Sequence, residues 1–372
     1  MSTILIPTIQ QDIHAAAVAM VLEEMGHRAV RWFCQDLPEA ATASFFVGRA
    51  PARLALREGT GVPFDPRSVD VFWHRRVADP IIQGAGVVPC DRKVARNETR
   101  RFLRGLMLAI SERSFAVNDY QSAQAGANKL YQLQVARALG LAVPETLISN
   151  DPEEIKTFLR RHQEAGTIFK SFQPVTWDAG STAALLYTHK VTLDRLPDDQ
   201  FLQLSPGIFQ AYVPKAFEVR ATFMGGQVFA ARLDSQVTQA GTVDWRLANH
   251  ESLPTSELRL PDEVADQCRA LMRRLGLVFG CFDFIVTPQG QWVFLEVNQM
   301  GQFLWVEEAT PEIPLLQMFC DFLVQRDPGF RYHRSGRPIA FADVIDEAAS
   351  RLETAAAVHQ RPATPPFVYA DA

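Results

Sequence analysis

The chain has 372 residues, of which 47% are hydrophobic and 21% are charged. These shares are typical of a folded globular protein with about two or three domains, and they exclude a disordered or fibrous chain. The formal net charge is −5, so the chain lacks the basic excess of proteins that bind nucleic acid or acidic membranes. We therefore expect no nucleic-acid partner, and an anionic ligand would have to be met by a local cluster of basic residues.

Cysteine usage and hydropathy indicate the compartment. The five cysteines are far apart and form neither a C-x-x-C pair nor a zinc pattern, which favours the reducing cytosol. The sequence contains no run of about 20 apolar residues that would span a membrane, and its start lacks the basic and apolar regions of a signal peptide. We expect a cytoplasmic protein with no membrane partner.

Residues 1–118 are predicted to form a parallel α/β domain. An apolar run at residues 4–6 precedes an amphipathic stretch that ends at Gly26, and a second strand-like run follows. We expect the Asp12 side chain to cap the helix. Because a helix connects the two strands, they should pair in parallel.

Two further features belong to this domain. A strand-like run at residues 69–76 ends in the basic cluster Trp73-His-Arg-Arg76, which fits an interface, a peptide site or a ligand cleft as well as a strand end with solvated arginines. An amphipathic helix is expected over residues 97–113, with Phe102 on its buried face.

A smaller α/β lobe is predicted over residues 119–205. Asn128 is expected to cap an amphipathic helix, and Asp151 is expected to cap a second one. The strand-like run at residues 167–172 comes next, and it surrounds Lys170 with apolar neighbours.

Residues 206–328 are predicted to form a lobe rich in antiparallel hairpins. One hairpin turns at Gly225-Gly226, and its first strand places Glu218 and Arg220 on one face.

The second hairpin of this lobe carries the most informative side chains. A two-residue turn at Gln289-Gly290 places Asp283 opposite Glu296, and the period of a strand puts Asn298 on the same face as Glu296. A type I turn with a bulge would shift the pairing by one residue but keep the two carboxylates as neighbours. Carboxylate and amide oxygens without His or Cys are ligands that Mg²⁺ selects, so these three residues are predicted metal ligands. The alternative is an acidic pair on a solvated strand face.

Residues 329–372 are a C-terminal extension. Its last part, from Arg361, is rich in proline, and such termini are extended or mobile. We expect deletion of this part to leave folding and activity nearly unchanged.

The order of these parts resembles the ATP-grasp superfamily, and more narrowly the microviridin-type graspetide synthetases. The narrower resemblance covers about residues 2–325 and rests on four motifs: Asn-Lys-Leu-Tyr-Gln-Leu at 128–133, Val-Pro-Glu-Thr-Leu-Ile-Ser-Asn-Asp-Pro at 143–152, Asp244-Trp-Arg246, and Phe-Leu-Glu-Val-Asn followed by Gly301-Gln-Phe-Leu-Trp-Val-Glu. It implies an ATP-grasp fold of the α/β (α+β) class. Residues 1–118 would be a parallel pre-ATP-grasp domain, 119–205 a central lobe, and 206–328 a C-terminal lobe.

The resemblance implies ATP and Mg²⁺ as cofactors and gives roles to basic residues. Lys129 and Lys170 would neutralise the phosphates as point charges, and the alternative is two exposed lysines. Arg220 and Arg246 would face the phosphates and the acyl group being activated, or would instead be salt-bridge partners of nearby acids.

The adenine and ribose also have implied partners. Glu218 would approach the ribose or a second cation. The adenine edge would be read by backbone groups of a linker that is otherwise an ordinary strand: Gln210, Ala211, Tyr212 and Val213.

The segment that should cover the triphosphate departs from the family pattern. Many ATP-grasp enzymes use a glycine-rich hairpin, but residues 172–187 hold only Gly180, beside Ser181 and Thr182. Phosphate contacts there would come partly from hydroxyl and backbone groups.

The implied function is ATP-dependent ligation of carboxylates in a peptide. The family phosphorylates Asp or Glu side chains of a ribosomal precursor peptide, and closes ester or amide macrocycles with Thr, Ser or Lys side chains through an acyl phosphate. The resemblance also implies a homodimer and a precursor peptide whose leader binds the central lobe and whose core is acidic and hydroxyl-rich.

Two other functions remain open at this point. One is an ATP-grasp ligase that joins an amino acid or small amine to a carboxylate substrate. The other is a non-catalytic protein that binds peptides on the same scaffold. The eight histidines are scattered, so the sequence names no general base.

Overall fold

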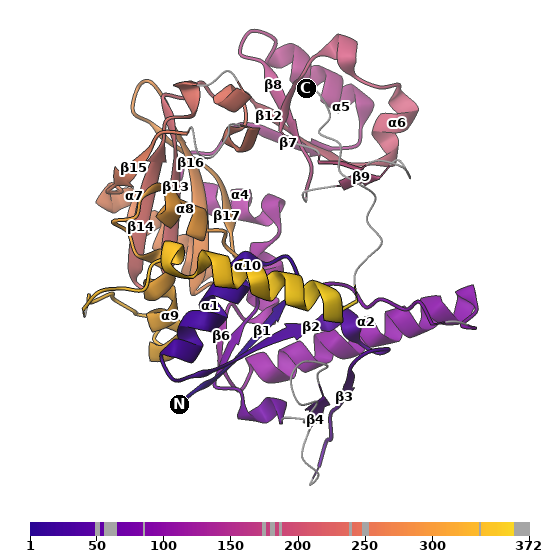
Figure 1. Ribbon diagram of the computed structural model, residues 1–372. Coiled ribbons are helices and arrows are strands. Elements are labelled where there is room, and N and C mark those ends of the chain that lie inside the picture. Colours follow the sequence, from indigo (N-terminus) through magenta and orange to yellow (C-terminus); the bar gives the residue numbers. More distant parts are fainter. Residues whose placement is uncertain are drawn as a thin grey trace.

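The computed structural model describes residues 1–48, 53–55, 65–84, 86–172, 176–178, 183–185, 188–237, 240–247, 253–334 and 336–360. Three larger sheets organise this part of the chain, one of them parallel and two antiparallel (Figure 1). No helix among the described residues is long and apolar enough to cross a membrane. The predicted tail from Arg361 lies outside the described residues.

The first sheet is parallel, as predicted, and its strands lie in the order β2-β1-β5-β6. Its strands are β1 (Thr3–Thr8), β2 (Arg28–Phe33), β5 (Val71–Trp73) and β6 (Phe115–Val117), and a small antiparallel pair, β3 (Thr42–Ser44) and β4 (Arg53–Ala55), follows β2. Helix α1 (Ile13–Glu24) connects β1 to β2, and α2 (Pro89–Ser111) precedes β6.

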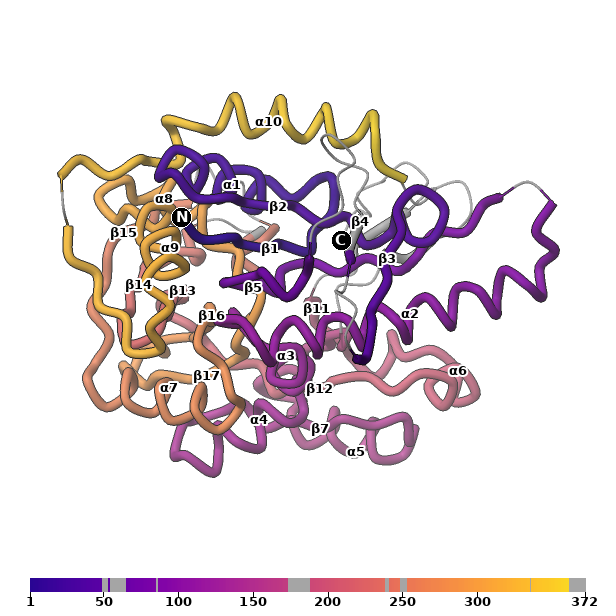
Figure 2. Tube along the Cα trace, turned by 90° about the horizontal axis from the view of Figure 1, so that it is seen from below, coloured from indigo at the N-terminus to yellow at the C-terminus, as the bar shows by residue number. Residues whose placement is uncertain are grey.

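Alternation along the strands separates the two faces of this sheet. Ile4 and Ile6 pack with α1 in one apolar cluster, whereas Leu5 and Phe72 pack with Leu103 of α2 in another. Helix α10 (Phe341–Val358) runs along α1 on the outer side, so the C-terminal extension closes the first cluster (Figure 2).

Two expectations for this domain are wrong. Asp12 stands at the N-cap position of α1 but makes no side-chain cap hydrogen bond, because its carboxylate pairs with the buried guanidinium of Arg75. Helix α2 begins at Pro89, before the predicted start, and it leaves Phe102 39% exposed. The solvated-arginine alternative also fails for Arg75, whose side chain is only 1% exposed.

The second sheet is antiparallel, with the strand order β11-β8-β12-β7. Its strands are β7 (Thr146–Ser149), β8 (Thr167–Lys170), β11 (His189–Val191) and β12 (Gly207–Ala211), and its helices are α5 (Pro152–Arg161) and α6 (Asp199–Leu204). Asp151 caps α5 with its carboxylate, as predicted. Strand β12 comes from the segment assigned by sequence to the next lobe, yet it pairs here with β7 and β8.

Two short helices, α3 (Tyr120–Gly126) and α4 (Lys129–Ala138), precede this sheet. Asn128 caps α4 by accepting the N–H of Tyr131, as predicted. In the predicted cover of the triphosphate, β9 (Thr176–Asp178) and β10 (Ala183–Leu185) pair in antiparallel fashion. Gly180, Ser181 and Thr182 lie outside the described residues.

The third sheet is antiparallel, with the order β15-β14-β13-β16-β17. Its strands are β13 (Phe217–Met224), β14 (Gln227–Leu233), β15 (Thr255–Leu258), β16 (Phe279–Val286) and β17 (Trp292–Asn298), and the helices are α7 (Asp262–Leu275), α8 (Leu304–Ala309) and α9 (Leu315–Gln325). The face that carries Val219, Phe223 and Phe284 packs on α7 and α4. Alternation therefore turns Arg220 and Asp283 to the opposite face.

The β16–β17 hairpin combines both registers that the sequence allowed. Next to its type I turn, with Gly290 at φ +80°, Phe284 pairs with Phe294. A bulge then shifts the register, so that Asp283 pairs with Glu296, as predicted. Without the bulge Phe294 and Glu296 would share a face, because the strand period is two. The extra residue lets the phenylalanine stay in the core while the carboxylate faces the other way.

Candidate active site

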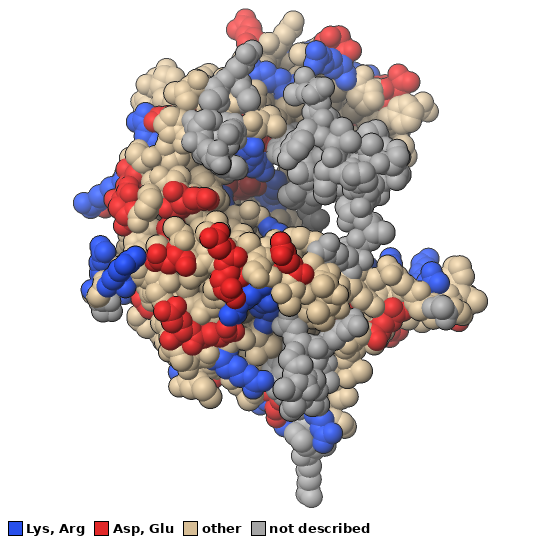
Figure 3. Space-filling view, viewed as in Figure 1, with Lys and Arg blue, Asp and Glu red and all other residues tan. Residues whose placement is uncertain are grey.

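A cavity of about 450 Å³ lies where β8 and β12 of the second sheet face β13, β16 and β17 of the third. In the space-filling view, basic and acidic atoms are visible together inside a hollow of this face (Figure 3). All but one of the residues predicted for a ligand site line this cavity: Lys170, Gln210, Ala211, Tyr212, Val213, Glu218, Arg220, Arg246, Asp283, Glu296 and Asn298. Lys129, from the start of α4, is not in the lining, but it reaches Glu296 from the side.

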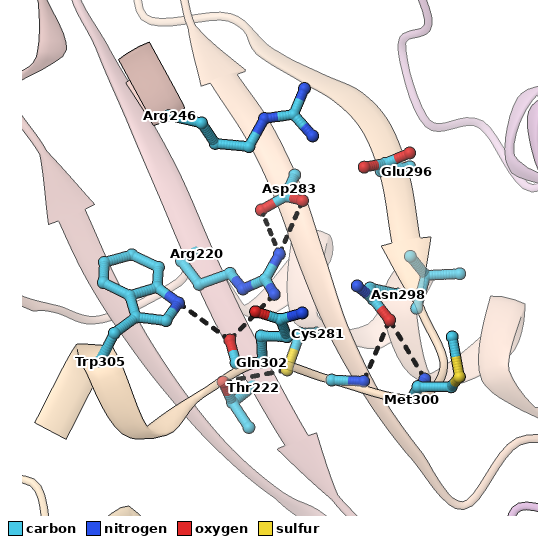
Figure 4. Close-up of polar contacts among 12 residues, drawn as sticks. Arg220, Thr222, Arg246, Cys281, Asp283, Glu296, Asn298, Met300, Gln302 and Trp305 are labelled. Carbon is cyan, nitrogen blue, oxygen red and sulfur yellow. Dashed lines mark hydrogen bonds and ion pairs between the residues drawn. The ribbon is translucent and has the colours of Figure 1, made fainter. Parts of the chain in front are cut away.

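Arg220 and Asp283 form an ion pair in the cavity (Figure 4). One terminal nitrogen of Arg220 donates to both carboxylate oxygens of Asp283, at 2.7 and 2.8 Å, and the other donates to the carbonyl of Gln302 at 3.0 Å. The Nε atom of Arg220 is buried and has no hydrogen-bond partner. Burial raises the pKa of Asp283, and the charge of Arg220 opposes this effect.

Glu296 sits among positive charges. Its carboxylate lies 3.1 Å from Nζ of Lys129, and Arg246 faces it across the cavity (Figure 4). Burial disfavours its charged form, but Lys129, Lys170 and Arg246 outweigh that penalty and lower the pKa of Glu296 to about 2. The group is therefore a carboxylate at any physiological pH, as a ligand for a divalent cation must be.

Lys170 differs from the other cavity cations because it forms no ion pair with a carboxylate among the described residues. Arg220 pairs with Asp283, and the remaining pairs are Lys129 with Glu296, Arg246 with Asp244, and Lys215 with Glu218. Burial lowers the pKa of Lys170 to about 8, the charge of Glu296 opposes this effect, and the charges of Lys129 and Arg246 add to it. A half-buried cation without an ion-pair partner is costly, and a polyanionic ligand would reduce that cost.

Two of these partners were not singled out by the sequence. Lys215 lies two residues after the predicted linker, and its Nζ lies 2.7 Å from Glu218 and 3.1 Å from the carbonyl of Val243. Its i,i+3 spacing to Glu218 was the available signal. Asp244 accepts two hydrogen bonds from the side chain of Arg246, at 2.5 and 2.8 Å. The sequence signal for this pair was that both residues belong to the motif Asp244-Trp-Arg246.

The predicted adenine linker has one free donor. The N–H groups of Ala211 and Tyr212 are taken by the carbonyls of Glu145 and Gly166. Among the described residues, the N–H of Val213 has no hydrogen-bond partner, so it can donate to the edge of a base. The Oε1 atom of Gln210 is buried and also lacks a partner.

The predicted metal ligands differ in whether their oxygen atoms already accept backbone hydrogen bonds. Asp283 and Glu296 face each other across the hairpin, but Oδ1 of Asn298 already accepts the N–H groups of Met300 and Gly301, at 3.1 and 3.0 Å. Asn298 would offer its amide oxygen to a cation only after releasing these two donors. The described part of the chain holds no group of three His, Cys, Asp or Glu residues placed to bind a metal. Two carboxylates fit Mg²⁺ when phosphate oxygens and water complete its shell.

His14, Trp245 and Trp305 complete the lining. Both tryptophans lie in motifs on which the sequence resemblance rests, but neither was predicted to line a ligand site, and no motif includes His14. His14, from α1, enters the cavity wall from the N-terminal domain. The rings of Trp245 and Trp305 contact each other, tilted by 31° with their centroids 4.7 Å apart, and the indole of Trp305 donates to the carbonyl of Gln302. With Ile168, Ile285 and Leu295 they add apolar surface to a cavity that also holds charged side chains.

Comparison of the sequence with known proteins gives remote relatives. No family model matches the chain. A probable alpha-L-glutamate ligase of Alcanivorax borkumensis is 26% identical over 200 residues, and one of Shewanella amazonensis is 26% identical over 199 residues. Each match covers 53% of this chain and 63% of the relative, so this chain spans less than two thirds of the relatives' length.

Solved structures give a longer match. The macrocyclase MdnC from Microcystis aeruginosa, bound with its precursor peptide MdnA, has a TM-score of 0.75 and 28% identity, and the match covers 87% of this chain and all of MdnC. The macrocyclase MdnB from the same organism has a TM-score of 0.71 and 28% identity, over 87% of this chain and 99% of MdnB.

A third structure supports the fold alone. It is a RiPP-associated ATP-grasp ligase of Chryseobacterium gregarium in complex with ADP and a leader and core peptide, and it has a TM-score of 0.76 at 24% identity, over 88% of this chain and 99% of that one. The predicted fold and the predicted resemblance are thus confirmed: this chain has the ATP-grasp fold, and it is similar over most of its length to the macrocyclases MdnC and MdnB.

Proposed function

We propose that this protein is an ATP-dependent carboxylate ligase that phosphorylates Asp or Glu side chains of a ribosomal precursor peptide and closes ester or amide macrocycles with Thr, Ser or Lys side chains. The observation that carries the proposal is the cavity that brings together Lys170, which forms no ion pair among the described residues, and two facing carboxylates, Asp283 and Glu296. The similarity to MdnC, whose structure contains a precursor peptide, supports a peptide as the substrate.

The cofactors of the proposed reaction are ATP and Mg²⁺. Lys170 and Lys129 would hold the phosphates, Val213 and its neighbours the adenine, and Asp283 and Glu296 the cation. Bound Mg²⁺ would neutralise part of the negative charge of the phosphate oxygens.

The protein's own work is to bring the reactants together and to neutralise charge. The γ-phosphoryl group moves to an oxygen of a substrate carboxylate, which yields ADP and an acyl phosphate. A hydroxyl or amine then attacks the acyl carbon, the new ester or amide bond forms, and phosphate leaves. Arg246 and Arg220 would stabilise the charge that develops on the transferred group.

Other parts of the proposal concern context. We propose that the protein acts as a homodimer in the cytoplasm, where its five free cysteines would stay reduced. We also propose residues 1–118, 119–205 and 206–328 as the pre-ATP-grasp domain and the two ATP-grasp lobes, with a peptide leader at the central lobe. The pairing of β12 favours a lobe boundary a few residues further along the chain.

The second candidate is a ligase that joins an amino acid or small amine to a carboxylate. The remote relatives named as probable alpha-L-glutamate ligases favour it. It would use the same nucleotide and metal residues and differ only in the acceptor pocket.

The two functions are separated by substrate dependence. ATP turnover is measured with Mg²⁺ alone, with a short Thr- and Glu-rich peptide encoded beside the gene, and with free L-glutamate. The proposal predicts slow turnover alone, stimulation by the peptide, and products lighter by one water per ring. Stimulation by free glutamate with an unchanged peptide mass would favour the second candidate.

A further inference from the structure

The loop between β17 and α8, residues 299–303, is the link between the N-terminal domain and the cavity. It follows Asn298 directly, and the carbonyl of its Gln302 accepts a hydrogen bond from Arg220 at 3.0 Å. That same guanidinium holds both oxygens of Asp283. A shift of the loop would therefore move the arginine and, with it, the carboxylate.

Arg75 holds this loop from the N-terminal domain. Its Nε and one terminal nitrogen donate to the two carboxylate oxygens of Asp12, at 3.0 and 3.1 Å. Its other terminal nitrogen donates to the carbonyls of Met300, at 2.6 Å, and Gly301. Both side chains of the ion pair are 1% exposed, so water does not compete for these bonds.

His14 holds the end of the same loop. Its Nε2 accepts the N–H groups of Phe303 and Leu304, at 3.0 and 3.2 Å. An Nε2 atom that accepts two hydrogen bonds carries no proton, so the ring is neutral with its proton on Nδ1. Burial, together with the charge of Arg75, keeps the pKa of His14 well below its usual range, and the acceptor role therefore persists at neutral pH.

The loop has little freedom to adopt another path. Gly301 has φ +63°, and a Cβ atom placed there would lie 2.5 Å from the ring of Phe279. The backbone is packed against this buried ring, and no side chain fits between them.

We infer that Arg75 and His14 are positioning residues, which act through the 299–303 loop to set Arg220 and Asp283 for the magnesium–nucleotide complex. The inference rests on the proposed function for the identity of that ligand. It means that the N-terminal domain is needed to complete the cavity, although Arg75 does not line it. Partners that orient groups at a metal site typically change affinity by about 10- to 100-fold when they are removed.

The test compares variants that differ only in the acceptor. His14→Leu removes the acceptor and keeps an apolar side chain, whereas His14→Gln keeps an oxygen that can accept the same N–H groups. Asp12→Asn combined with Arg75→Gln removes the buried ion pair and leaves only Arg76, whose side chain is 30% exposed, without the carboxylate that lies 3.9 Å from it. Arg100→Gln, which breaks an exposed Arg–Asp pair in the same domain, is the matched control.

Two measurements are made on each full-length variant: the affinity for ADP with Mg²⁺, by calorimetry, and amide exchange in peptides that cover residues 299–304. We expect His14→Leu and the double variant to weaken binding by about tenfold or more and to speed exchange in the loop. His14→Gln should recover most of the loss, and Arg100→Gln should match the wild type.

Different results would contradict the positioning role of the loop contacts and the proposed function. Faster loop exchange with unchanged affinity would make the loop contacts merely structural, and unchanged exchange in folded variants would remove the inference altogether. If the wild type itself fails to bind ADP with Mg²⁺, the proposed function fails, and the exchange data still report on the loop. Loss of folding in the double variant leaves the two His14 variants to decide.

Discussion

Lys129 contacts Glu296 at 3.1 Å, so a carboxylate predicted to hold a metal is also the counter-ion of a lysine predicted to hold phosphate. In an empty cavity the two charges neutralise each other. A magnesium–nucleotide complex brings its own opposite charges, and each side chain then has a partner of the right sign. The charges of both side chains are therefore balanced whether or not a magnesium–nucleotide complex is bound.

Replacement of either carboxylate should separate catalysis from folding. Glu296→Gln and Asp283→Asn each remove a negative ligand, so turnover should fall by about 10² to 10³-fold, and added Mg²⁺ should rescue only part of it. Steady-state ATP turnover and peptide mass are measured, with circular dichroism as the folding check. Asp266→Asn, at an exposed ion pair on α7, is the control. Near-wild-type activity in either folded variant would remove that residue from the metal site.

Loss of the unmatched cation should have opposite effects on binding and on stability. Lys170→Met removes a half-buried charge that has no ion-pair partner among the described residues, so the melting temperature should hold or rise. The affinity for ADP with Mg²⁺ should fall by at least about tenfold, because one phosphate neutraliser is gone. Lys156→Met, on the outer side of α5, should leave binding unchanged. A variant that binds ADP as the wild type does would exclude Lys170 from the phosphate site.

Nucleotide affinity should depend on pH in a defined window. The pKa of Lys170 lies near 8 in the folded protein, below its ordinary value of 10.5, so the empty folded state holds this proton less tightly than the unfolded chain does. The lysine's contribution to the free energy of unfolding is therefore highest above pH 10.5, where the lysine is neutral in both states, and it decreases as pH falls toward 8. ADP affinity should have the opposite trend and fall as pH rises above about 8, since a neutral amine does not balance phosphate charge.

The matched variant for this pH effect is Lys170→Arg. A guanidinium stays charged over the whole range, so the decline in affinity above pH 8 should be absent or much smaller in the variant. Calorimetry with ADP and Mg²⁺ from pH 7 to 9.5 measures both proteins. Parallel declines would assign the pH dependence to another group.

Two truncations of the C-terminal extension should have very different effects on folding. Phe341, Val344 and Ala348 of α10 are buried in the cluster that contains α1, and the N–H of Phe341 donates to the buried carboxylate of Glu307 at 2.7 Å. Removal of residues 341–372 should therefore unfold or aggregate the protein, because it uncovers an apolar face. Removal of residues 361–372 should shift the melting temperature by only a few degrees and leave turnover intact. A large loss from the shorter truncation would show that those last residues dock on the body.

The sequence identified local relationships well. The caps at Asn128 and Asp151 need only a few neighbouring residues. The turn sequence also allowed the one-residue shift that pairs Phe284 with Phe294. The second shift, which restores the predicted Asp283–Glu296 pairing, had no local signal, because its place along β17 depends on where Phe294 packs in the core.

Long-range partners were beyond what the sequence could indicate. Asp12 has the composition and place of a helix cap, yet Arg75, 63 residues away, takes its carboxylate because both are buried. His14 reaches the cavity only because the N-terminal domain packs on the third sheet, and no local pattern marks it. Phe102 fits the helical period, but it lies on a side of α2 that is only partly covered, and it is 39% exposed.

The central claim is that this cavity activates a carboxylate with the γ-phosphoryl group of ATP. The direct measurement uses the carboxylate substrate that supports ATP turnover, the precursor peptide in our proposal, with ¹⁸O in its side-chain carboxylates. After turnover with ATP and Mg²⁺, the released phosphate is analysed by mass spectrometry. We predict one ¹⁸O atom in phosphate for each bond formed, because the oxygen that accepts the phosphoryl group leaves with it. Bond formation accompanied by unlabelled phosphate would contradict the account.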